Sequence, residues 1–192
     1  MRVISGLRRG KKLKTVKGML TRPTSDRVKE GVFNVLREKI SGSRFLDLFA
    51  GTGNIGIEAL SRGAEEAFFV EKNPQAFRVL KTNVEECDFN KASNLYLMDA
   101  FVALKVFKKN NLNFNLIYLD PPYKFSNLEK IIKQIIEFSL LANEGVVVVE
   151  TGKNTNLPCG FLNLHKIKES IYGDTKVTYY KLMKEEERNG CV

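Results

Sequence analysis

The pattern of hydrophobic and polar residues divides the chain into a helical lead-in and a longer core in which strand-like and helix-like segments alternate. In the lead-in, residues 23–43, apolar side chains recur at the spacing of one face of an α-helix. They are Val28, Val32, Phe33, Val35, Leu36 and Ile40. Thr24 or Ser25 precedes this run and can accept hydrogen bonds from its first free N–H groups. A helix capped by one of these two residues is therefore predicted.

From Phe45 onward, short apolar runs alternate with amphipathic stretches of helical period. This alternation is typical of βα units around a mostly parallel sheet. The runs that predict strands are Arg44 to Phe49, Ala67 to Val70, Leu95 to Met98, Leu116 to Leu119 and Val146 to Val149. The stretches that predict helices lie near Ile55 to Ser61, Pro74 to Cys87, Phe101 to Phe107 and Leu128 to Phe138. The predicted class is α/β, a Rossmann-like sheet with helices on its faces.

Two further strand-like segments follow, Leu164 to Tyr172 and Lys176 to Leu182, and Gly173 and Asp174 between them suit the tight turn of a hairpin. The predicted sheet therefore has seven strands, mostly parallel, with a C-terminal antiparallel hairpin. No repeat or linker divides the 192 residues, so we expect a single domain. Its parts are a small basic N-terminal arm (1–22), the lead-in (23–43) and a Rossmann-like core (44–183), with a charged tail after them (184–192).

Positive charge is concentrated near the start of the chain. The sequence has 31 Lys and Arg against 22 Asp and Glu, a net charge of +9. Such an excess favours a polyanionic partner, and nucleic acid is the simplest one, because binding releases counterions. A solvated basic surface without a partner is the alternative. The early basic residues are Arg2, Arg8, Arg9, Lys11, Lys12, Lys14, Lys17, Arg22, Arg27 and Lys29.

Cysteine content and hydropathy argue against several classes of protein. Cys87, Cys159 and Cys191 are odd in number and lack the paired spacing of a zinc site. No stretch resembles a secretory signal or has the apolar length of a membrane span. We therefore expect a cytoplasmic protein with no metal and no membrane attachment.

A glycine-rich turn lies between the first core strand and the helix after it, and reads Phe45-Leu-Asp-Leu-Phe-Ala-Gly-Thr-Gly-Asn-Ile-Gly56. Gly51 and Gly53 lack side chains, so a ligand can lie against the backbone at the carboxyl edge of the sheet. The glycine spacing also fits a dinucleotide fingerprint, which keeps a nicotinamide or flavin enzyme as an alternative. Asp47 favours S-adenosylmethionine, because a carboxylate suits its zwitterionic methionine moiety and would repel a pyrophosphate.

Acidic residues also end the next two predicted strands. Glu71 can accept hydrogen bonds from both hydroxyls of a ribose. Asp99 is placed to accept from an adenine amino group, although it also suits the N-cap of the helix that follows. The predicted cofactor-binding residues are Asp47, Phe49, Gly51, Gly53, Glu71, Lys72, Asp99 and Ala100.

The most informative segment is Leu116-Ile-Tyr-Leu-Asp-Pro-Pro-Tyr123, where an apolar strand runs into a carboxylate, two prolines and an aromatic ring. The prolines remove two backbone donors and fix two φ angles, so that the Asp120 carboxylate and backbone carbonyls are presented as acceptors. Acceptors without donors suit the amino group of a base, and Tyr123 offers a face on which the base can stack. A purely structural turn is the alternative. The predicted catalytic residues are Asp120, Pro121, Pro122 and Tyr123.

Together these motifs resemble those of class I S-adenosylmethionine-dependent methyltransferases. Motif I of that group matches Asp47 to Gly53, and the motif IV of its amino-methylating members matches Asp120 to Tyr123. Over most of its length the chain is similar to the bacterial RsmD family of 16S ribosomal RNA guanine-N2 methyltransferases. The segments that carry this likeness are Arg2 to Gly6, Thr21 to Arg27, Asp47 to Gly51, Glu58 to Ala64, Asp120 to Tyr123 and Tyr172 to Asp174.

The resemblance implies S-adenosylmethionine as cofactor and, as substrate, the N2 amino group of a guanine in 16S rRNA of the 30S subunit. Because motif IV is shared with adenine-N6 DNA methyltransferases, that activity is the alternative. A monomer is expected. His165, the single histidine, is expected to have a structural or surface role. The candidate RNA contacts are Arg8, Arg9, Lys11, Lys12, Arg22 and Arg27, although Arg22, Thr24 and Arg27 could instead close over the cofactor.

Overall fold

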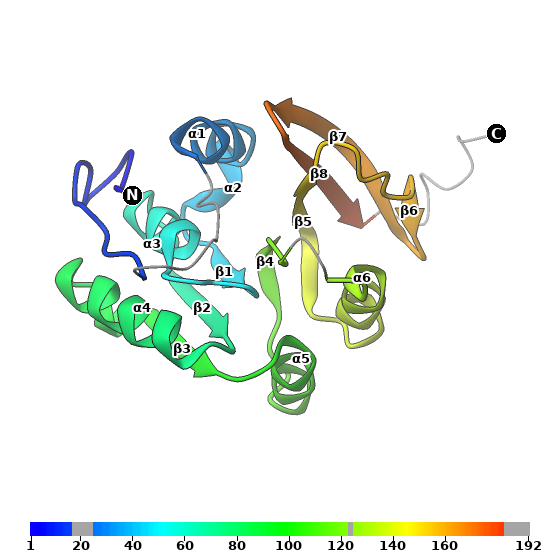
Figure 1. The fold of residues 1–192 in the computed structure, drawn as a ribbon. Coiled ribbons are helices and arrows are strands. Elements are labelled where there is room, and N and C mark those ends of the chain that lie inside the picture. Colours follow the sequence, from blue (N-terminus) through cyan, green and yellow to red (C-terminus); the bar gives the residue numbers. More distant parts are fainter. Residues whose placement is uncertain (17–24, 123–124, 183–192) are drawn as a thin grey trace.

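The computed structural model describes residues 1–16, 25–122 and 125–182. They contain one sheet with the strand order β3-β2-β1-β4-β5-β8-β7-β6 (Figure 1). The first five strands in this order pair in parallel, and the last three join them antiparallel. The predicted α/β class and the C-terminal hairpin are confirmed. The strands are β1 (Arg44–Asp47), β2 (Glu66–Glu71), β3 (Ser93–Leu97), β4 (Phe114–Leu119), β5 (Leu141–Gly152), β6 (Gly160–Phe161), β7 (Leu164–Tyr172) and β8 (Thr175–Leu182).

Two strands differ from the prediction. The sheet is eight-stranded rather than seven-stranded, because β6 adds a two-residue strand that is too short to produce a hydrophobic pattern. β5 is much longer than the predicted Val146 to Val149. It pairs with Phe114 at its start and with Thr175 at its end. Asn143 and Glu144 within it are exposed. These polar residues interrupt the hydrophobic pattern, so the pattern did not predict the first half of the strand.

The lead-in forms two helices, although its apolar spacing predicted one. The break is at Leu36, where φ is −87° and ψ is 1°. Leu36 and Ile40 are both buried, so the apolar pattern continues through the break. Ser25 is the N-cap, since its side chain accepts from the Val28 N–H at 3.3 Å. The helices are α1 (Asp26–Val35), α2 (Arg37–Ile40), α3 (Asn54–Ser61), α4 (Pro74–Glu86), α5 (Ala100–Lys109) and α6 (Leu128–Glu137), with a 3-10 turn at Asn90–Ala92.

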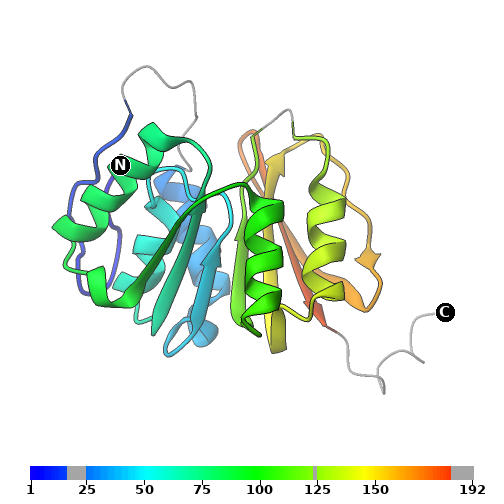
Figure 2. The ribbon, with the colours of Figure 1, turned by 90° about the horizontal axis from the view of Figure 1, so that it is seen from below.

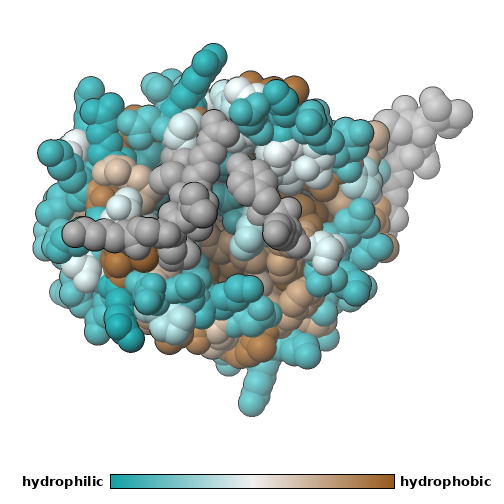
Figure 3. All heavy atoms as spheres, in the orientation of Figure 1, coloured by the Kyte–Doolittle hydropathy of each residue, from teal (hydrophilic) through white to brown (hydrophobic). Residues whose placement is uncertain are grey.

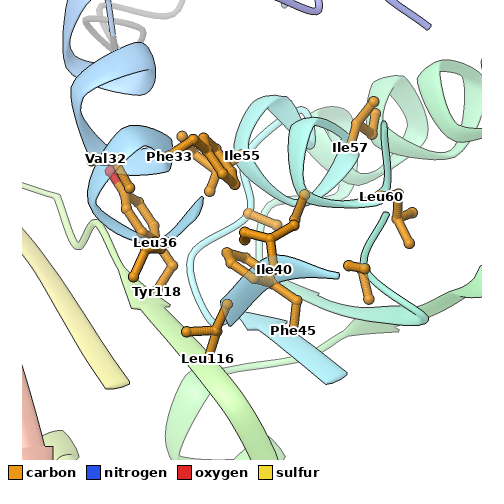
Figure 4. Packing of buried hydrophobic residues seen from close by; sticks show 14 of the residues in the cluster. Val32, Phe33, Leu36, Ile40, Phe45, Ile55, Ile57, Leu60, Leu116 and Tyr118 are labelled. Atoms are coloured by element: carbon orange, nitrogen blue, oxygen red, sulfur yellow. The ribbon is translucent and has the colours of Figure 1, made fainter. Parts of the chain in front are cut away.

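The helices cover the two faces of the sheet unequally. One face packs against α1, α2, α3 and α4, where Phe33 of α1 stacks on Phe45 of β1 (Figure 4). The opposite face packs against α5 and α6 (Figure 2). Phe68 of β2 is central there, with ring centroids 5.1 Å from Phe114 and 6.0 Å from Phe107. Both faces are therefore buried, as a parallel sheet requires.

The N-terminal hairpin, residues 1–14, makes up most of the described part of the predicted basic arm, residues 1–16. Arg2 and Lys12 form an antiparallel bridge. Val3 and Leu13 are buried in the core on the α3 side of the sheet. Gly6 has a φ of +82°, and a Cβ there would lie 1.7 Å from the Ser61 carbonyl oxygen at the end of α3. The hairpin is thus packed against the core by apolar side chains and by one obligatory glycine.

Candidate active site at the carboxyl edge of the sheet

The carboxyl ends of the parallel strands bring acidic residues to one edge of the sheet. Asp47 ends β1 and Glu71 ends β2. Asp99 precedes α5, and Asp120 follows β4. Asp47 pairs with Tyr118 across β1 and β4, two residues before Asp120. The edge at which an open α/β sheet binds ligands is therefore lined with carboxylates.

The glycine loop, Gly51 to Gly53, joins β1 to α3 in a conformation that favours glycine. Gly51 has a φ of +54° and Gly53 a φ of +88°. A Cβ at Gly53 would lie 2.5 Å from the Leu80 side chain, whereas a Cβ at Gly51 would meet nothing within 4 Å. Gly53 is thus packed closely against Leu80, whereas Gly51 faces open space. The backbone at Gly51 is accessible to a ligand that approaches closely.

Glu71 holds the glycine loop to the start of α4. One carboxylate oxygen accepts from the Gly51 N–H at 2.8 Å, and the other accepts from the Asn73 N–H at 2.6 Å. Each carboxylate oxygen has two lone pairs. The Glu71 carboxylate can therefore keep both of these bonds and still accept from the hydroxyls of a ribose laid over the loop.

Asp47 is a buried carboxylate below the glycine loop, with 2% of its surface exposed. It accepts from the Gly56 N–H, in the first turn of α3, at 3.1 Å. Burial raises the pKa of Asp47 to about 7, and the charge of Glu71 adds to this, while backbone hydrogen bonds from Gly56 and Phe49 oppose it. A buried carboxylate with this pKa gains from a cationic partner, as the ammonium group of a methionine moiety would be.

Asp99 is the N-cap of α5, as the alternative role predicted. Its carboxylate accepts from the Phe101 N–H at 2.9 Å. Contact between Asp99 and an adenine amino group remains a prediction. Ala100, the first residue of α5, is buried, and Lys72, directly after β2, is exposed.

Aromatic side chains line the same edge near the adenine position that the sequence predicts. The Phe49 ring lies 5.3 Å from the Phe125 ring, edge to face, and Phe101 lies 6.4 Å from Phe125. All three rings are partly buried. The sequence reading missed Phe101 and Phe125, because each stands outside a recognised motif. Their proximity arises only when β1, α5 and the segment after β4 come together.

The Asp-Pro-Pro segment follows β4 directly. Asp120 and Pro121 are half-buried and Pro122 is exposed. The Pro122 carbonyl accepts from the Phe125 N–H at 2.8 Å, which turns the chain back towards Phe49. Tyr123 lies outside the described residues, so its predicted stacking role remains a prediction. The segment presents acceptors at the edge, beside the end of β1.

Glu150 of β5 is an acidic residue that the sequence reading did not single out. It is 8% exposed and accepts a short hydrogen bond from the Tyr118 hydroxyl. Leu119 pairs with Val149, so Asp120 and Glu150 are the residues that follow this pair on neighbouring strands. Burial raises the pKa of Tyr118 well above its ordinary value, and the negative charges of Glu150, Asp120 and Asp47 add to this. Tyr118 therefore stays a hydrogen-bond donor at neutral pH.

The candidate RNA contacts are of two kinds. Arg8 has structural partners, since its Nε donates to the Cys87 carbonyl at 2.7 Å and its guanidinium pairs with Asp88 at 3.1 Å. Arg9, Lys12 and Arg27 are exposed, Lys11 is half-buried, and Arg22 and Thr24 lie outside the described residues. Hydrophilic side chains cover most of the rim of the face shown in Figure 3.

His165 lies far from this edge. It pairs with Gly160 of β6 and with Lys181 of β8, and Lys181 in turn pairs with Val146, on the side of β5 away from the carboxyl edge. Within residues 1–16, 25–122 and 125–182, no helix is long and apolar enough to cross a membrane. Nor do three or more His, Cys, Asp or Glu side chains gather to hold a metal ion in the same part of the chain.

Comparisons with known proteins agree with this geometry. The profile of the family described as Conserved hypothetical protein 95 matches residues 1–181. "Putative rRNA methyltransferase YlbH" of Bacillus subtilis (strain 168) is 41% identical over 181 residues, which cover 94% of this chain and 98% of that protein. Ribosomal RNA small subunit methyltransferase D of Escherichia coli (strain K12) is 32% identical, with 94% of this chain and 89% of that protein covered.

A solved structure shares the whole architecture. It is described as "Putative methyltransferase yhhF from Escherichia coli" and superposes with a TM-score of 0.82 at 30% identity, covering 95% of this chain and 97% of that one. The eight-stranded sheet with its glycine loop is thus a class I methyltransferase fold. The chain belongs to the Conserved hypothetical protein 95 family, which is the RsmD family that its motifs indicated.

Proposed function

We propose that this protein transfers a methyl group from S-adenosylmethionine to the N2 amino group of a guanine in 16S rRNA of the 30S subunit. The observation that carries the proposal is the placement of two motifs on neighbouring strands. The glycine loop follows β1, the Asp-Pro-Pro segment follows β4, and β1 and β4 pair directly. A cofactor on the loop would therefore lie beside a base amino group held at Asp120.

The cofactor side of the site fits S-adenosylmethionine. Gly51 leaves room for close approach, Glu71 can accept from the ribose, and the buried Asp47 favours a cationic group. A pyrophosphate would bring negative charge beside the Glu71 carboxylate and would further oppose ionisation of the buried Asp47, which disfavours the nicotinamide and flavin alternative. Phe49, Phe101 and Phe125 supply apolar surface for an adenine ring.

The substrate side of the site fits an amino group. When bound, S-adenosylmethionine supplies an electrophilic methyl group. The Asp120 carboxylate and the Pro121 carbonyl would accept hydrogen bonds from the amino group, which orients its lone pair and stabilises the positive charge that develops on nitrogen. Positioning would supply most of the rate. The methylated amine is acidic enough to lose its proton to water or to Asp120, so no histidine is needed.

The substrate is proposed from the relatives and from the charge of the chain. Relatives that match most of the chain are named for ribosomal RNA small subunit methylation. The net charge of +9 and the exposed Arg9, Lys12 and Arg27 favour an RNA partner. We expect the protein to act in the cytoplasm as a monomer. DNA adenine-N6 methylation is the second candidate, because the Asp-Pro-Pro segment would serve an adenine amino group equally well.

The test is transfer of radiolabelled methyl from S-adenosylmethionine to 30S subunits from cells that lack the enzyme, followed by nucleoside analysis. N2-methylguanosine in 16S rRNA is expected. Labelled N6-methyladenine in duplex DNA, with no label in 30S subunits, would support the second candidate instead.

Asp120→Ala is the matching variant. It should abolish transfer and leave S-adenosylmethionine affinity near that of the wild type, as calorimetry can show. Glu137→Ala, at the end of α6 that leads into the start of β5, removes an exposed carboxylate at the other edge of the sheet and should retain transfer. Full activity of Asp120→Ala would remove the catalytic role of this residue.

A further inference from the structure

Two buried side chains connect the N-terminal hairpin to the residues on either side of Gly53 in the glycine loop. The first is Asn83 of α4, which is 1% exposed. Its Nδ2 donates to the Thr52 carbonyl at 2.9 Å and to the Lys14 carbonyl at 3.0 Å. Its Oδ1 accepts from the Lys14 N–H at 2.8 Å. Asn83 thus pairs with both backbone groups of one hairpin residue while it holds a carbonyl of the loop.

The second connection is Lys29 of α1, which is fully buried. Its Nζ donates to the Arg2 carbonyl at 2.6 Å and to Oδ1 of Asn54, the first residue of α3, at 2.8 Å. Glu58 balances the charge, with an oxygen 3.3 Å from Nζ. A buried lysine with three such partners is strongly fixed in place, because each donor would otherwise lack a partner away from water.

Glu58 extends the same connection along the hairpin. Its carboxylate accepts from the Ile4 N–H at 2.7 Å and from the Ser5 N–H at 3.0 Å. It also pairs with Arg62 at 2.7 Å. The hairpin backbone is therefore joined to α3 at Glu58 as well as through Lys29. Movement of the hairpin would break buried polar contacts on both sides of Gly53.

The glycine loop needs such support because glycine has the freest backbone of all residues. Gly51 and Gly53 sit in left-handed conformations, and the flanking Thr52 and Asn54 are the residues that Asn83 and Lys29 hold. A loop that is fixed in its binding conformation before the ligand arrives loses less conformational entropy on binding. Affinity for the ligand should therefore depend on these two contacts.

We propose that Asn83 and Lys29 are positioning residues for cofactor binding, which hold the glycine loop against the N-terminal hairpin in its binding conformation. The inference rests on the proposed function, in which this loop binds S-adenosylmethionine. It gives the hairpin a second role beside that of a basic surface: its backbone, at Arg2 and Lys14, braces the cofactor site.

The test compares two variants that each loosen the hairpin. Asn83→Ala removes the contact that spans hairpin and loop. Ser61→Ala is the matched control, since the Ser61 hydroxyl donates to the Ser5 carbonyl at 2.6 Å and accepts from the Arg8 N–H at 3.0 Å, with no bond to the loop. Calorimetry with S-adenosylmethionine gives the Kd of each, and urea unfolding shows that each is folded.

Asn83→Ala should weaken S-adenosylmethionine binding roughly tenfold, as loss of buried hydrogen bonds would predict, and Ser61→Ala should bind like the wild type. In steady-state assays the KM for the cofactor should rise with little change in kcat. An unchanged Kd, or an equal rise in both variants, would overturn the inference. If Asn83→Ala does not fold, Lys29→Met replaces it against the same control. A wild-type protein that binds no S-adenosylmethionine would instead contradict the proposed function.

Discussion

Replacement of Asp47 by asparagine should change how the stability of the protein depends on pH. Asp47 is 2% exposed, and burial raises its pKa from 3.8 to about 7. Between these two values the folded protein keeps a proton that the unfolded chain has lost. The wild type therefore loses stability as pH rises from about 4 to about 7. The amide side chain of the Asp47→Asn variant cannot ionise, and its oxygen can still accept from the Gly56 N–H.

The size of the effect follows from the difference between the two pKa values. One pKa unit corresponds to about 1.4 kcal/mol, so a difference of about three gives about 4 kcal/mol over the whole range. Most of this change falls between pH 5 and pH 8. Over that range the free energy of unfolding of the variant should rise by about 3 kcal/mol relative to that of the wild type. Other groups titrate in both proteins and cancel in the comparison.

Urea unfolding of both proteins across this pH window measures the difference directly. The carboxyl carbon of Asp47, followed by NMR in the wild type, should titrate with a midpoint near pH 7. If the difference in the free energy of unfolding between variant and wild type stays constant within about 1 kcal/mol over this pH window, the reasoning is refuted. Burial would then not disfavour the charged form of Asp47.

Three further substitutions test how the elements around the site are held. Lys29→Met should lower the free energy of unfolding by about 3 kcal/mol in urea, because it breaks a buried ion pair, whereas the exposed Lys81→Met should change it by less than about 1 kcal/mol. Gly56→Ala should cost about 1–3 kcal/mol in thermal unfolding, since its Cβ would lie 2.2 Å from the Phe69 ring; an unchanged Tm would show that α3 can move away from β2. Tyr118→Phe removes the hydroxyl that donates to the buried Glu150 carboxylate, and it should lower the free energy of unfolding by about 1–3 kcal/mol in chemical denaturation. An unchanged free energy of unfolding would mean that another donor replaces the hydroxyl.

Local chemistry determined much of what the sequence revealed. Strands and helices alternate in period along the chain, so the α/β class and the C-terminal hairpin could be predicted from the pattern alone. Gly51, Gly53 and the Asp-Pro-Pro segment were recognisable because each constrains its own backbone. The parallel sheet then brings their ends to one edge, and Asp47 and Asp120 lie on neighbouring strands there because β1 pairs with β4.

Only the tertiary structure decided which side chains from distant segments contact one another. Glu150 accepts from Tyr118, and the Phe125 ring packs against Phe49. The hydrophobic pattern of the sequence does not predict either contact. The basic arm looked like a charged extension, yet its backbone is bound by buried side chains at Asn83 and Lys29. Sequence patterns indicate the local backbone conformation and secondary structure that a residue favours. Burial and hydrogen-bond partners depend instead on which distant segments pack together. The methyltransferase class could therefore be predicted from motifs, but the support of the glycine loop could not.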